Sequence, residues 1–365
     1  MISNHRVTQS DIAKEAGVSR TAVSVVLAGR SEPVIAQHTR ERILATAARL
    51  GYSPRFVMSA DANATKNLGF ITRDVEADGN PDIYYRRMFD GASRIAQASN
   101  YHLLLSFYQG DLALPDLVLQ RKVDGLIIGD ALRCSPEWIE RVQRQVPLVL
   151  LNTYADDMEI DAVMPDLSGG MRKAVEHLVM LGHGRLALFG VVEPHPQDRL
   201  FVERIAGFHA ALTKFALPDD PAYILLPPPV ERTFAEIDAC ARQALRQWAA
   251  LPAPPTAVLC LNDLFACRLL GVAKELGIRV PEQLSVVGFD GVPFAEHVIP
   301  ALTTIEQPYA DMGQTATRLL LERLEGLERP ALQVRVQLTL LVRDSTGPAP
   351  VTDLASALRP ALVTA

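Results

Sequence analysis

The chain lacks the features that mark membrane-spanning, secreted and disulfide-stabilised proteins. No apolar run approaches the roughly 20 residues of a transmembrane helix, and the polar start from Met1 to Arg6 has no signal-peptide pattern. Only four cysteines occur in 365 residues, with no CxxC spacing and no histidines at zinc-binding spacing. We therefore expect free thiols in a reducing cytoplasm, no membrane partner, no metal and no cofactor.

Motifs of the common enzyme classes are absent as well. The chain has no Walker loop, no GxGxxG after its first apolar strand, no GxSxG and no paired acids at a strand end beyond an Asn/Asp set described below. His177 and His183 resemble a metal or catalytic pair, but they stand six residues apart at a predicted helix end, which favours a structural role. We therefore expect a binding protein and not an enzyme.

Charge is distributed unevenly along the chain. Residues 1–66 carry nine Lys/Arg and five Asp/Glu, a net charge of +4, whereas the whole chain is −6 and the remainder is therefore −10. A basic head on an acidic body keeps polyanions away from every part of the molecule except the head. The distribution predicts contact with nucleic acid through the first 66 residues.

Residues 7–29 have the pattern of two short helices joined by a tight turn. Thr8 can cap the first helix, Gly17 can end it in the left-handed conformation, and Ser19 can cap the second. The second helix would turn an apolar stripe inward and leave outward Arg20, Thr21, Ser24 and Val25. A short helix of this kind, braced by a preceding one, fits the major groove of DNA. Two helices that only pack together are the plain alternative.

Further helices and a linker complete the head. A third amphipathic helix is predicted from about Gln37 to Leu50, with a stop at Gly51. A short fourth helix over 55–62 follows Pro54, which suits a first helical turn. Residues 63–67 have the composition of a linker, so the head is expected to span residues 1–65.

From Leu68 onward short apolar strands alternate with helices, which is the pattern of parallel sheets covered on both faces. Strands are predicted at 68–72, 102–107, 125–128, 148–151, 186–189, 257–261 and 285–288, and helices at 84–98, 167–181, 202–214, 234–249 and 264–276. About 280 residues exceed one open sheet, so two sheets are expected. The Ala- and Pro-rich stretch 347–365 shows little periodicity and is predicted to be disordered.

Polar residues stand where three of these strands end. Asn152 follows one strand, Asn262 and Asp263 follow a second, and Asp290 follows a third. The carboxyl ends of parallel strands share one edge of a sheet, so these side chains would face one crevice. Asp290 could instead be only a turn residue. Asn262 and Asp263 could cap the next helix, and Asp263 is the one expected to do so.

The chain resembles the lactose-repressor family of bacterial transcription regulators over residues 6–346. The motifs that carry the resemblance occur in the family's order and are VTQSDIAKEAGVSRTAVSVVL, TRERILATAARLGYSP, KVDGLII, AVEHLVMLGHGRLALFG, CLNDLFA, LSVVGFDG and PALTTIEQP. The resemblance implies an all-α helix-turn-helix head with a hinge helix and an α/β body over 66–346. That body has two lobes with parallel sheets, like periplasmic sugar-binding proteins. The chain would cross between lobes near Pro165, Ala301 and Arg329.

The resemblance also implies which residues contact DNA. Arg20 and Thr21 would contact bases at the start of the second helix, and Val25 one turn later would contact a thymine methyl group. Arg20 could read a guanine or grip a phosphate. The full set of implied DNA contacts is Thr8, Ser19, Arg20, Thr21, Ala22, Ser24, Val25, Arg30, Val57 and Met58. The family's minor-groove leucine falls here on Asp61, which phosphates would repel, so Val57, Met58 or Ala60 would share that role.

The family's effector positions fall on the polar strand ends and on nearby helices. The implied effector contacts are Arg73, Asp74, Tyr84, Tyr85, Asn152, Arg204, Asn262, Asp290 and Tyr309. An Arg–Asn–Asp set offers donors and a carboxylate acceptor that suit the vicinal hydroxyls of a sugar. Asn152 stands where some sugar-responsive members have an aspartate, and Tyr84 and Tyr85 could equally be core residues.

Three functions are compatible with these patterns. The first is a repressor released from a palindromic operator by a small carbohydrate effector. The second is a corepressor-dependent regulator that responds to a nucleobase or another metabolite. The third is a small-molecule binding protein without a DNA function, which leaves the basic head unexplained. The expected partners are double-stranded operator DNA, an effector and a second copy of the chain, as a homodimer or a dimer of dimers.

Overall fold

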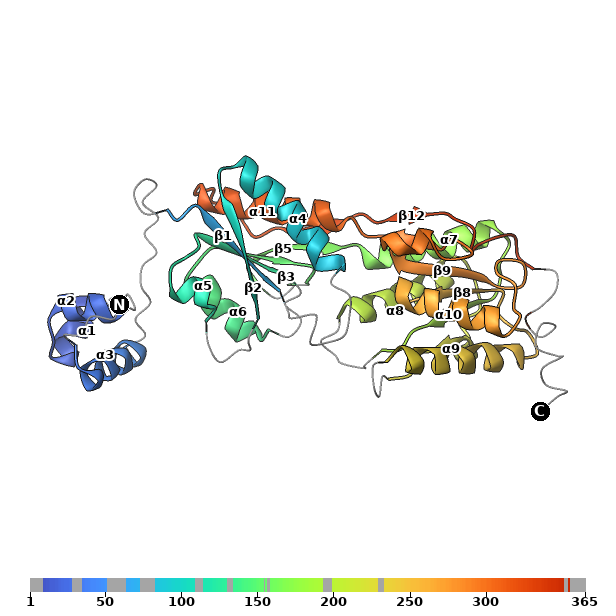
Figure 1. Ribbon diagram of the computed structural model, residues 1–365, viewed down its shortest axis with the longest axis horizontal. Coiled ribbons are helices and arrows are strands. Elements are labelled where there is room, and N and C mark those ends of the chain that lie inside the picture. Colours follow the sequence, from blue (N-terminus) through green and yellow to red (C-terminus); the bar gives the residue numbers. More distant parts are fainter. Residues whose placement is uncertain are drawn as a thin grey trace.

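The computed structural model describes most of the chain. The described residues are 9–27, 35–50, 64–72, 83–108, 114–129, 134–153, 155, 158–192, 199–228, 233–350 and 354. They form a three-helix head and two α/β lobes (Figure 1). The fold class is therefore the expected one.

The head has a hydrophobic core of its own. Its helices are α1 (Gln9–Ala16), α2 (Arg20–Leu27) and α3 (Gln37–Arg49). Fully buried at its centre are Ile12, Val23 and Ile43. Gly17 ends α1 with a φ of +64°, and the Ser19 hydroxyl accepts a hydrogen bond from the Ala22 amide at 3.1 Å. The turn and the start of the second helix thus lie where the sequence predicted them.

Lobe 1 is a sheet of six parallel strands in the order β11-β5-β4-β3-β1-β2. The strands are β1 (Asn67–Thr72), β2 (His102–Phe107), β3 (Gly125–Gly129), β4 (Leu148–Leu151), β5 (Asp161–Pro165) and β11 (Gln333–Val336). The helices of this lobe are α4 (Ile83–Ala98), α5 (Asp116–Leu119), α6 (Pro136–Gln143) and α11 (Tyr309–Leu324). Strands β3, β4 and β5 are buried throughout, as expected for the middle of a covered parallel sheet.

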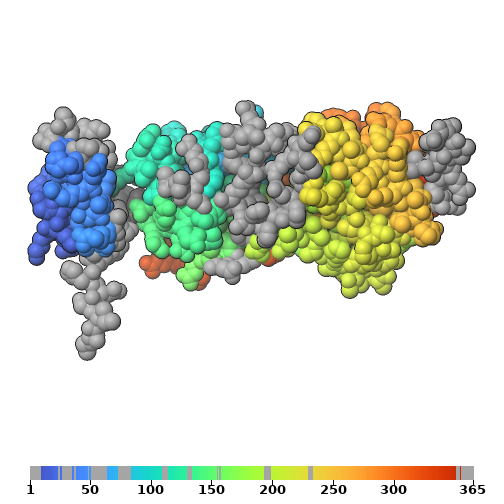
Figure 2. All heavy atoms as spheres, turned by 90° about the horizontal axis from the view of Figure 1, so that it is seen from below, coloured from blue at the N-terminus to red at the C-terminus, as the bar shows by residue number. Residues whose placement is uncertain are grey.

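Lobe 2 has a second six-stranded sheet in the order β12-β10-β9-β8-β6-β7, in which only β12 is antiparallel to its neighbour. Its strands are β6 (Leu186–Phe189), β7 (Ile224–Leu225), β8 (Ala257–Cys260), β9 (Ser285–Asp290), β10 (Thr303–Glu306) and β12 (Thr339–Leu341). Its helices are α7 (Leu167–Met180), α8 (Arg199–Lys214), α9 (Phe234–Ala249) and α10 (Asp263–Glu275). The space-filling view shows the green surface of lobe 1 and the yellow-to-orange surface of lobe 2 as separate regions (Figure 2).

The chain crosses between the lobes after β5, after β10 and after β11. The first crossing lies beside Pro165, as expected. The other two lie at 307–308 and 337–338, later than the expected positions at Ala301 and Arg329. The reason is that β10 still pairs with β9 in lobe 2 and β11 still pairs with β5 in lobe 1. Both strands have four residues with mixed polarity, which gave no strand signal.

Two glycines bring α4 and α11 into backbone contact. A Cβ on Gly91 would lie 2.0 Å from the carbonyl oxygen of Ala310, and one on Gly313 would lie 2.0 Å from that of Met88. No side chain fits at either position. Because α11 follows directly from lobe 2, this packing fixes its first residue, Tyr309, beside the first turn of α4.

The stretch after residue 346 differs from expectation. Disorder was predicted over 347–365, but Gly347 and Ala349 are hydrogen-bonded to lobe 2, and Leu354 is fully buried in a large hydrophobic cluster. The carbonyl of Gly347 contacts His183 Nε2 at 3.0 Å, and the Ala349 amide donates to Leu181 at 2.8 Å. Single hydrogen bonds hold an irregular segment in place without creating any periodicity, so the sequence pattern could not reveal them.

Within the described ranges, no helix is long and apolar enough to cross a bilayer. The same residues contain no group of three or more His, Cys, Asp or Glu side chains placed to hold a metal ion. All four cysteines are free, and Cys260 is buried. Free thiols were expected from their spacing.

Candidate functional site

The start of α2 carries the exposed residues expected to contact DNA. Arg20 and Thr21, the first two residues of α2, are exposed, whereas Val23 is buried. Val25 is half-buried, and no acidic residue lies in the first turn of α2. A helix start with an outward arginine and no carboxylate suits an approach to phosphates and base edges.

Part of the predicted DNA contact set lies outside the described residues. These positions are Thr8, Arg30, Val57 and Met58, and the side chain of Ser24 is not described either; Asp61, at the family's leucine position, also lies outside the described residues. The DNA-contact assignment therefore stays a prediction, which rests on the described face of α2.

A buried ion pair lies at the edge of the lobe 2 sheet. Asp290 ends β9 and Arg204 lies on α8, and their side chains are only 5% and 7% exposed. Arg204 Nη2 donates to Asp290 Oδ1 at 2.8 Å. Asp290 has a φ of +122°, a strained backbone conformation of the kind that is retained at functional sites. Asp290 is therefore not merely a turn residue.

Two further side chains donate to the same carboxylate oxygen. Gln307 Nε2 lies 2.7 Å from Asp290 Oδ1, and the Tyr309 hydroxyl lies at 3.3 Å. Burial raises the pKa of Asp290, whereas the Arg204 charge and the donor from Gln307 oppose that rise. Gln307 was not predicted, although it lies within the PALTTIEQP motif, directly before the crossing into α11.

The Arg204 guanidinium has several further contacts, but one of its nitrogen atoms has no hydrogen-bond partner. Its Nη1 donates to the carbonyl of Leu261, and its guanidinium carbon lies 4.2 Å from the centre of the Phe289 ring. Among the described residues, Arg204 Nε and Gln307 Oε1 are buried without a hydrogen-bond partner. A buried donor and a buried acceptor left open beside one carboxylate are features of a site for a polar ligand.

The residue that caps α10 is Asn262 and not Asp263, the residue expected to do so. Asn262 caps α10 by accepting a hydrogen bond from the Phe265 amide at 2.8 Å. Asp263 is fully buried and accepts hydrogen bonds from the Thr304 hydroxyl and, at 2.8 Å, from the Val292 amide. The expectation that Asp263 is the cap is wrong, because its carboxylate instead braces β10 and the segment after β9. Burial, followed by the charge of Asp290, raises the pKa of Asp263 to about 7.

Lobe 1 contributes Tyr84 from the first turn of α4. Its ring centre lies 5.3 Å from that of Tyr309, and the charge of the Asp290 carboxylate acts on its hydroxyl. Burial, followed by the charge of Asp290, raises the pKa of Tyr84 well above its usual value. Arg87, one turn later, was not predicted, and it donates to the Gly291 carbonyl at 3.4 Å and lies 3.7 Å from Glu306. Side chains of both lobes thus meet at Asp290.

The other predicted effector residues are not joined to this cluster by the contacts described above. Asn152 follows β4, is buried and has a φ of +57°. Its backbone amide donates a hydrogen bond to the carbonyl of Val163. Tyr85 is buried on α4, which suits a core role. Arg73 and Asp74 lie outside the described residues.

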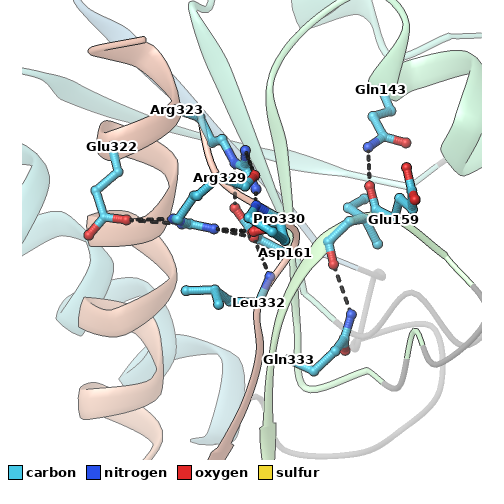
Figure 3. A network of polar contacts seen from close by, with 10 residues as sticks. Gln143, Glu159, Asp161, Glu322, Arg323, Arg329, Pro330, Leu332 and Gln333 are labelled. Atoms are coloured by element: carbon cyan, nitrogen blue, oxygen red, sulfur yellow. Dashed lines mark hydrogen bonds and ion pairs between the residues drawn. The ribbon is translucent and has the colours of Figure 1, made fainter. Parts of the chain in front are cut away.

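A second polar network surrounds Asp161, the first residue of β5 in lobe 1 (Figure 3). Asp161 accepts hydrogen bonds from Arg323 at 2.8 Å and from Arg329 at 2.7 Å. Burial opposes ionisation of Asp161, but these hydrogen bonds lower its pKa below the usual value. Beside it lies an open cavity of about 850 Å³. The network holds the segment that leads into β11, which is a structural role.

Two parts of the chain match known families. Residues 8–55 match the bacterial regulatory proteins of the lacI family, and residues 175–346 match a periplasmic binding protein-like domain. Escherichia coli (strain K12) has a relative named HTH-type transcriptional repressor CytR. It is 30% identical over 349 residues, which cover 94% of this chain and 97% of that protein.

Two solved structures resemble more than nine-tenths of the chain. The complex of the transcriptional regulator CelR with cellobiose is 25% identical, with a TM-score of 0.65, and covers 93% of this chain and 100% of that one. The lac repressor dimer bound to operator and the anti-inducer ONPF is 26% identical, with a TM-score of 0.63, and covers 94% and 100%. These relatives bear the names of regulators and not of enzymes, as expected. The chain therefore belongs to the LacI family of bacterial regulatory proteins.

Proposed function

We propose that the protein is a repressor that binds a palindromic operator as a homodimer and leaves it when a carbohydrate-type effector binds between the lobes. The observation that carries the proposal is the buried Arg204–Asp290 pair, with an open donor and an open acceptor beside it. The protein would act in the cytoplasm, where the operator is accessible.

The chemistry of the cluster favours a polyhydroxyl ligand. Asp290 supplies a carboxylate acceptor, Arg204 Nε an unpaired donor and Gln307 Oε1 an unpaired acceptor. A hydroxyl group both donates and accepts, so vicinal hydroxyls can satisfy such a set together. The rings of Tyr84 and Tyr309 offer apolar faces beside it. The relative CelR forms a complex with cellobiose, which supports this ligand class.

Both lobes contact the cluster, and this gives the effector a means of changing the conformation. Tyr84 and Arg87 come from α4 in lobe 1, whereas Asp290 and Glu306 belong to lobe 2. A ligand that binds Asp290 competes with these contacts and so has a different affinity for different lobe arrangements. Such a difference in affinity is what linkage requires for a ligand to shift the DNA-binding equilibrium.

The edge of the lobe 1 sheet is suited to a second copy of the chain. Strand β2 lies at this edge, and Leu105 and Phe107 on it are 49% and 47% exposed. Exposed apolar side chains on an edge strand favour pairing with another surface. The lac repressor relative is a dimer on its operator, and two heads related by a two-fold axis match a palindrome.

The test begins with selection of a binding sequence from random DNA duplexes by the full chain. We expect a palindrome with half-sites about one helical turn apart. Sugars, nucleosides and nucleobases are then titrated into the complex in a gel-shift assay, with Arg204→Met as the site variant and Arg199→Met on the same helix as the control. A sugar should release wild-type and control protein at concentrations that leave Arg204→Met bound.

Three results would contradict the proposal. Absence of any sequence-selective DNA binding would refute the repressor function. Binding of a monomer to a single asymmetric half-site would refute the dimer. A nucleobase that strengthens DNA binding, with no response to sugars, would replace sugar induction with corepression.

A further inference from the structure

The carboxylate of Asp124 holds the chain at the point where it enters lobe 1. Thr65 donates to Asp124 Oδ1 twice, from its amide and from its hydroxyl, at 2.9 Å each. The Lys66 amide donates to Oδ2 at 2.9 Å. The Asp124 amide in turn donates to the Asn67 carbonyl at 2.8 Å. Both residues before β1 are thus bound to one carboxylate that directly precedes β3.

Apolar burial does not explain this arrangement. Residues 64–67 are exposed or half-buried, and Lys66 has a φ of +56°, which is uncommon for a residue with a Cβ. The Lys66 ammonium lies 4.6 Å from the centre of the Tyr101 ring, on the surface. Charge-assisted hydrogen bonds to Asp124 therefore maintain the left-handed turn. Strained backbone kept by specific contacts points to a functional constraint.

This turn lies where the connection from the head enters lobe 1. Residues 51–63 join α3 to this point, so the direction of the chain at Thr65 sets where the connection to the head leaves lobe 1. In a two-fold dimer there are two such exits. The distance and angle between them limit how far apart the two heads can sit on DNA.

We propose that Asp124 is a positioning residue for operator binding, which fixes the exit of the linker and thereby the half-site spacing that the dimer accepts. This inference rests on the function proposed above. Asp124 is remote in the fold from the Asp290 cluster, because it lies before β3 whereas the cluster lies at the carboxyl end of β9. Its loss is therefore expected to leave effector affinity unchanged.

Electrostatics alone predicts the opposite effect on DNA affinity. Removing a negative charge from a DNA-binding protein reduces repulsion of phosphates and strengthens binding to any sequence. If Asp124 positions the linker, its removal should weaken binding to the preferred operator, since the freed residues must be ordered again on DNA. The direction of the change therefore separates the two explanations.

The experiment compares full-chain Asp124→Ala, Asp124→Asn and Thr65→Val with wild type on the operator that the wild type selects. The same duplex with one or two base pairs inserted or deleted at its centre measures spacing preference. Asp116→Asn, an exposed acid on lobe 1, is the control for charge. Melting temperature and effector affinity are recorded for every variant.

We expect Asp124→Ala to bind the selected operator about tenfold more weakly and to lose most of its preference for the selected spacing. Asp124→Asn and Thr65→Val should lie between it and wild type, because each keeps part of the hydrogen bonding. Asp116→Asn should match wild type.

Full spacing preference in Asp124→Ala would overturn the inference, and so would equal losses of effector affinity and melting temperature, which indicate a merely structural role. If the wild type selects no operator at all, the proposed function fails instead. The two failures are therefore distinguishable.

Discussion

The Arg204–Asp290 ion pair is expected to make a large contribution to the stability of the body. Both side chains are almost completely buried, and Asp290 Oδ1 accepts from three side chains. Truncation of either partner leaves a buried charge without compensation, which costs about 3–5 kcal/mol. We therefore expect Asp290→Ala and Arg204→Ala each to lower the free energy of unfolding by about that amount.

The double variant Arg204→Met/Asp290→Leu should recover much of this loss. It removes both charges and retains side-chain volume, and such replacements of buried ion pairs are often neutral or stabilising. Urea denaturation of wild type, both singles and the double gives a coupling energy by double-mutant cycle. If each single variant costs less than about 1 kcal/mol, the value typical of exposed pairs, the pair is not buried and desolvated as described. Effector affinity is meaningful only for variants that remain folded in this assay.

Three further predictions address separate parts of the molecule. Asp263 has a pKa of about 7 in the folded state, above the ordinary value of 3.8. Between these two pH values the folded state binds a proton that the unfolded state has lost. The contribution of Asp263 to the free energy of unfolding therefore falls as the pH rises toward 7. Asp263→Asn should remove that contribution, so the difference in unfolding free energy between wild type and variant should change with a slope of at most about 1.4 kcal/mol per pH unit between pH 5 and 6; an unchanged difference would contradict the assignment. Gly313→Val should lower the free energy of unfolding of the body by about 1–3 kcal/mol or more, measured by thermal denaturation, because the Cβ of the new side chain would clash with the Met88 carbonyl. Gly271→Ala on α10, with open space at its Cβ, is the matched control and should stabilise slightly. Arg20→Ala should cost about 1–3 kcal/mol on the selected operator and much less on random DNA, measured by titration at fixed salt; equal losses would make Arg20 a phosphate contact.

The cluster explains why a stabilising role and a binding role can coincide. The pair Arg204 and Asp290 joins α8 to β9, while Gln307 and Tyr309 come from the crossing between lobes. Tyr84 adds a contact from lobe 1. An effector at this point would therefore act on groups that hold the two lobes together, which is how binding energy can reach a distant head.

Local sequence patterns were sufficient to predict a helical head and a body of two mainly parallel sheets, although β5, β7, β10, β11 and β12 were not among the predicted strands. Apolar runs such as those of β2 and β4 lie where alternation predicted them, and Gly17 and Ser19 marked the turn of the head. Strand and helix periodicity depends on nearest neighbours along the chain, so a single sequence contains it. The same holds for the charge of the head and for the polar residues at the carboxyl ends of β8 and β9.

Only the tertiary structure decided which polar groups pair. Arg204 and Asp290 are 86 residues apart, and nothing local in the sequence pairs them. Strands of four residues with mixed polarity, such as β10 and β11, are recognised only by their neighbours in a sheet, so the crossings at 307–308 and 337–338 were misplaced. Asp263 looked like a helix cap because capping chemistry is local, but burial against Thr304 and the Val292 amide gave it another role. Side-chain pairing depends on distances across the fold, and the sequence pattern does not contain those distances.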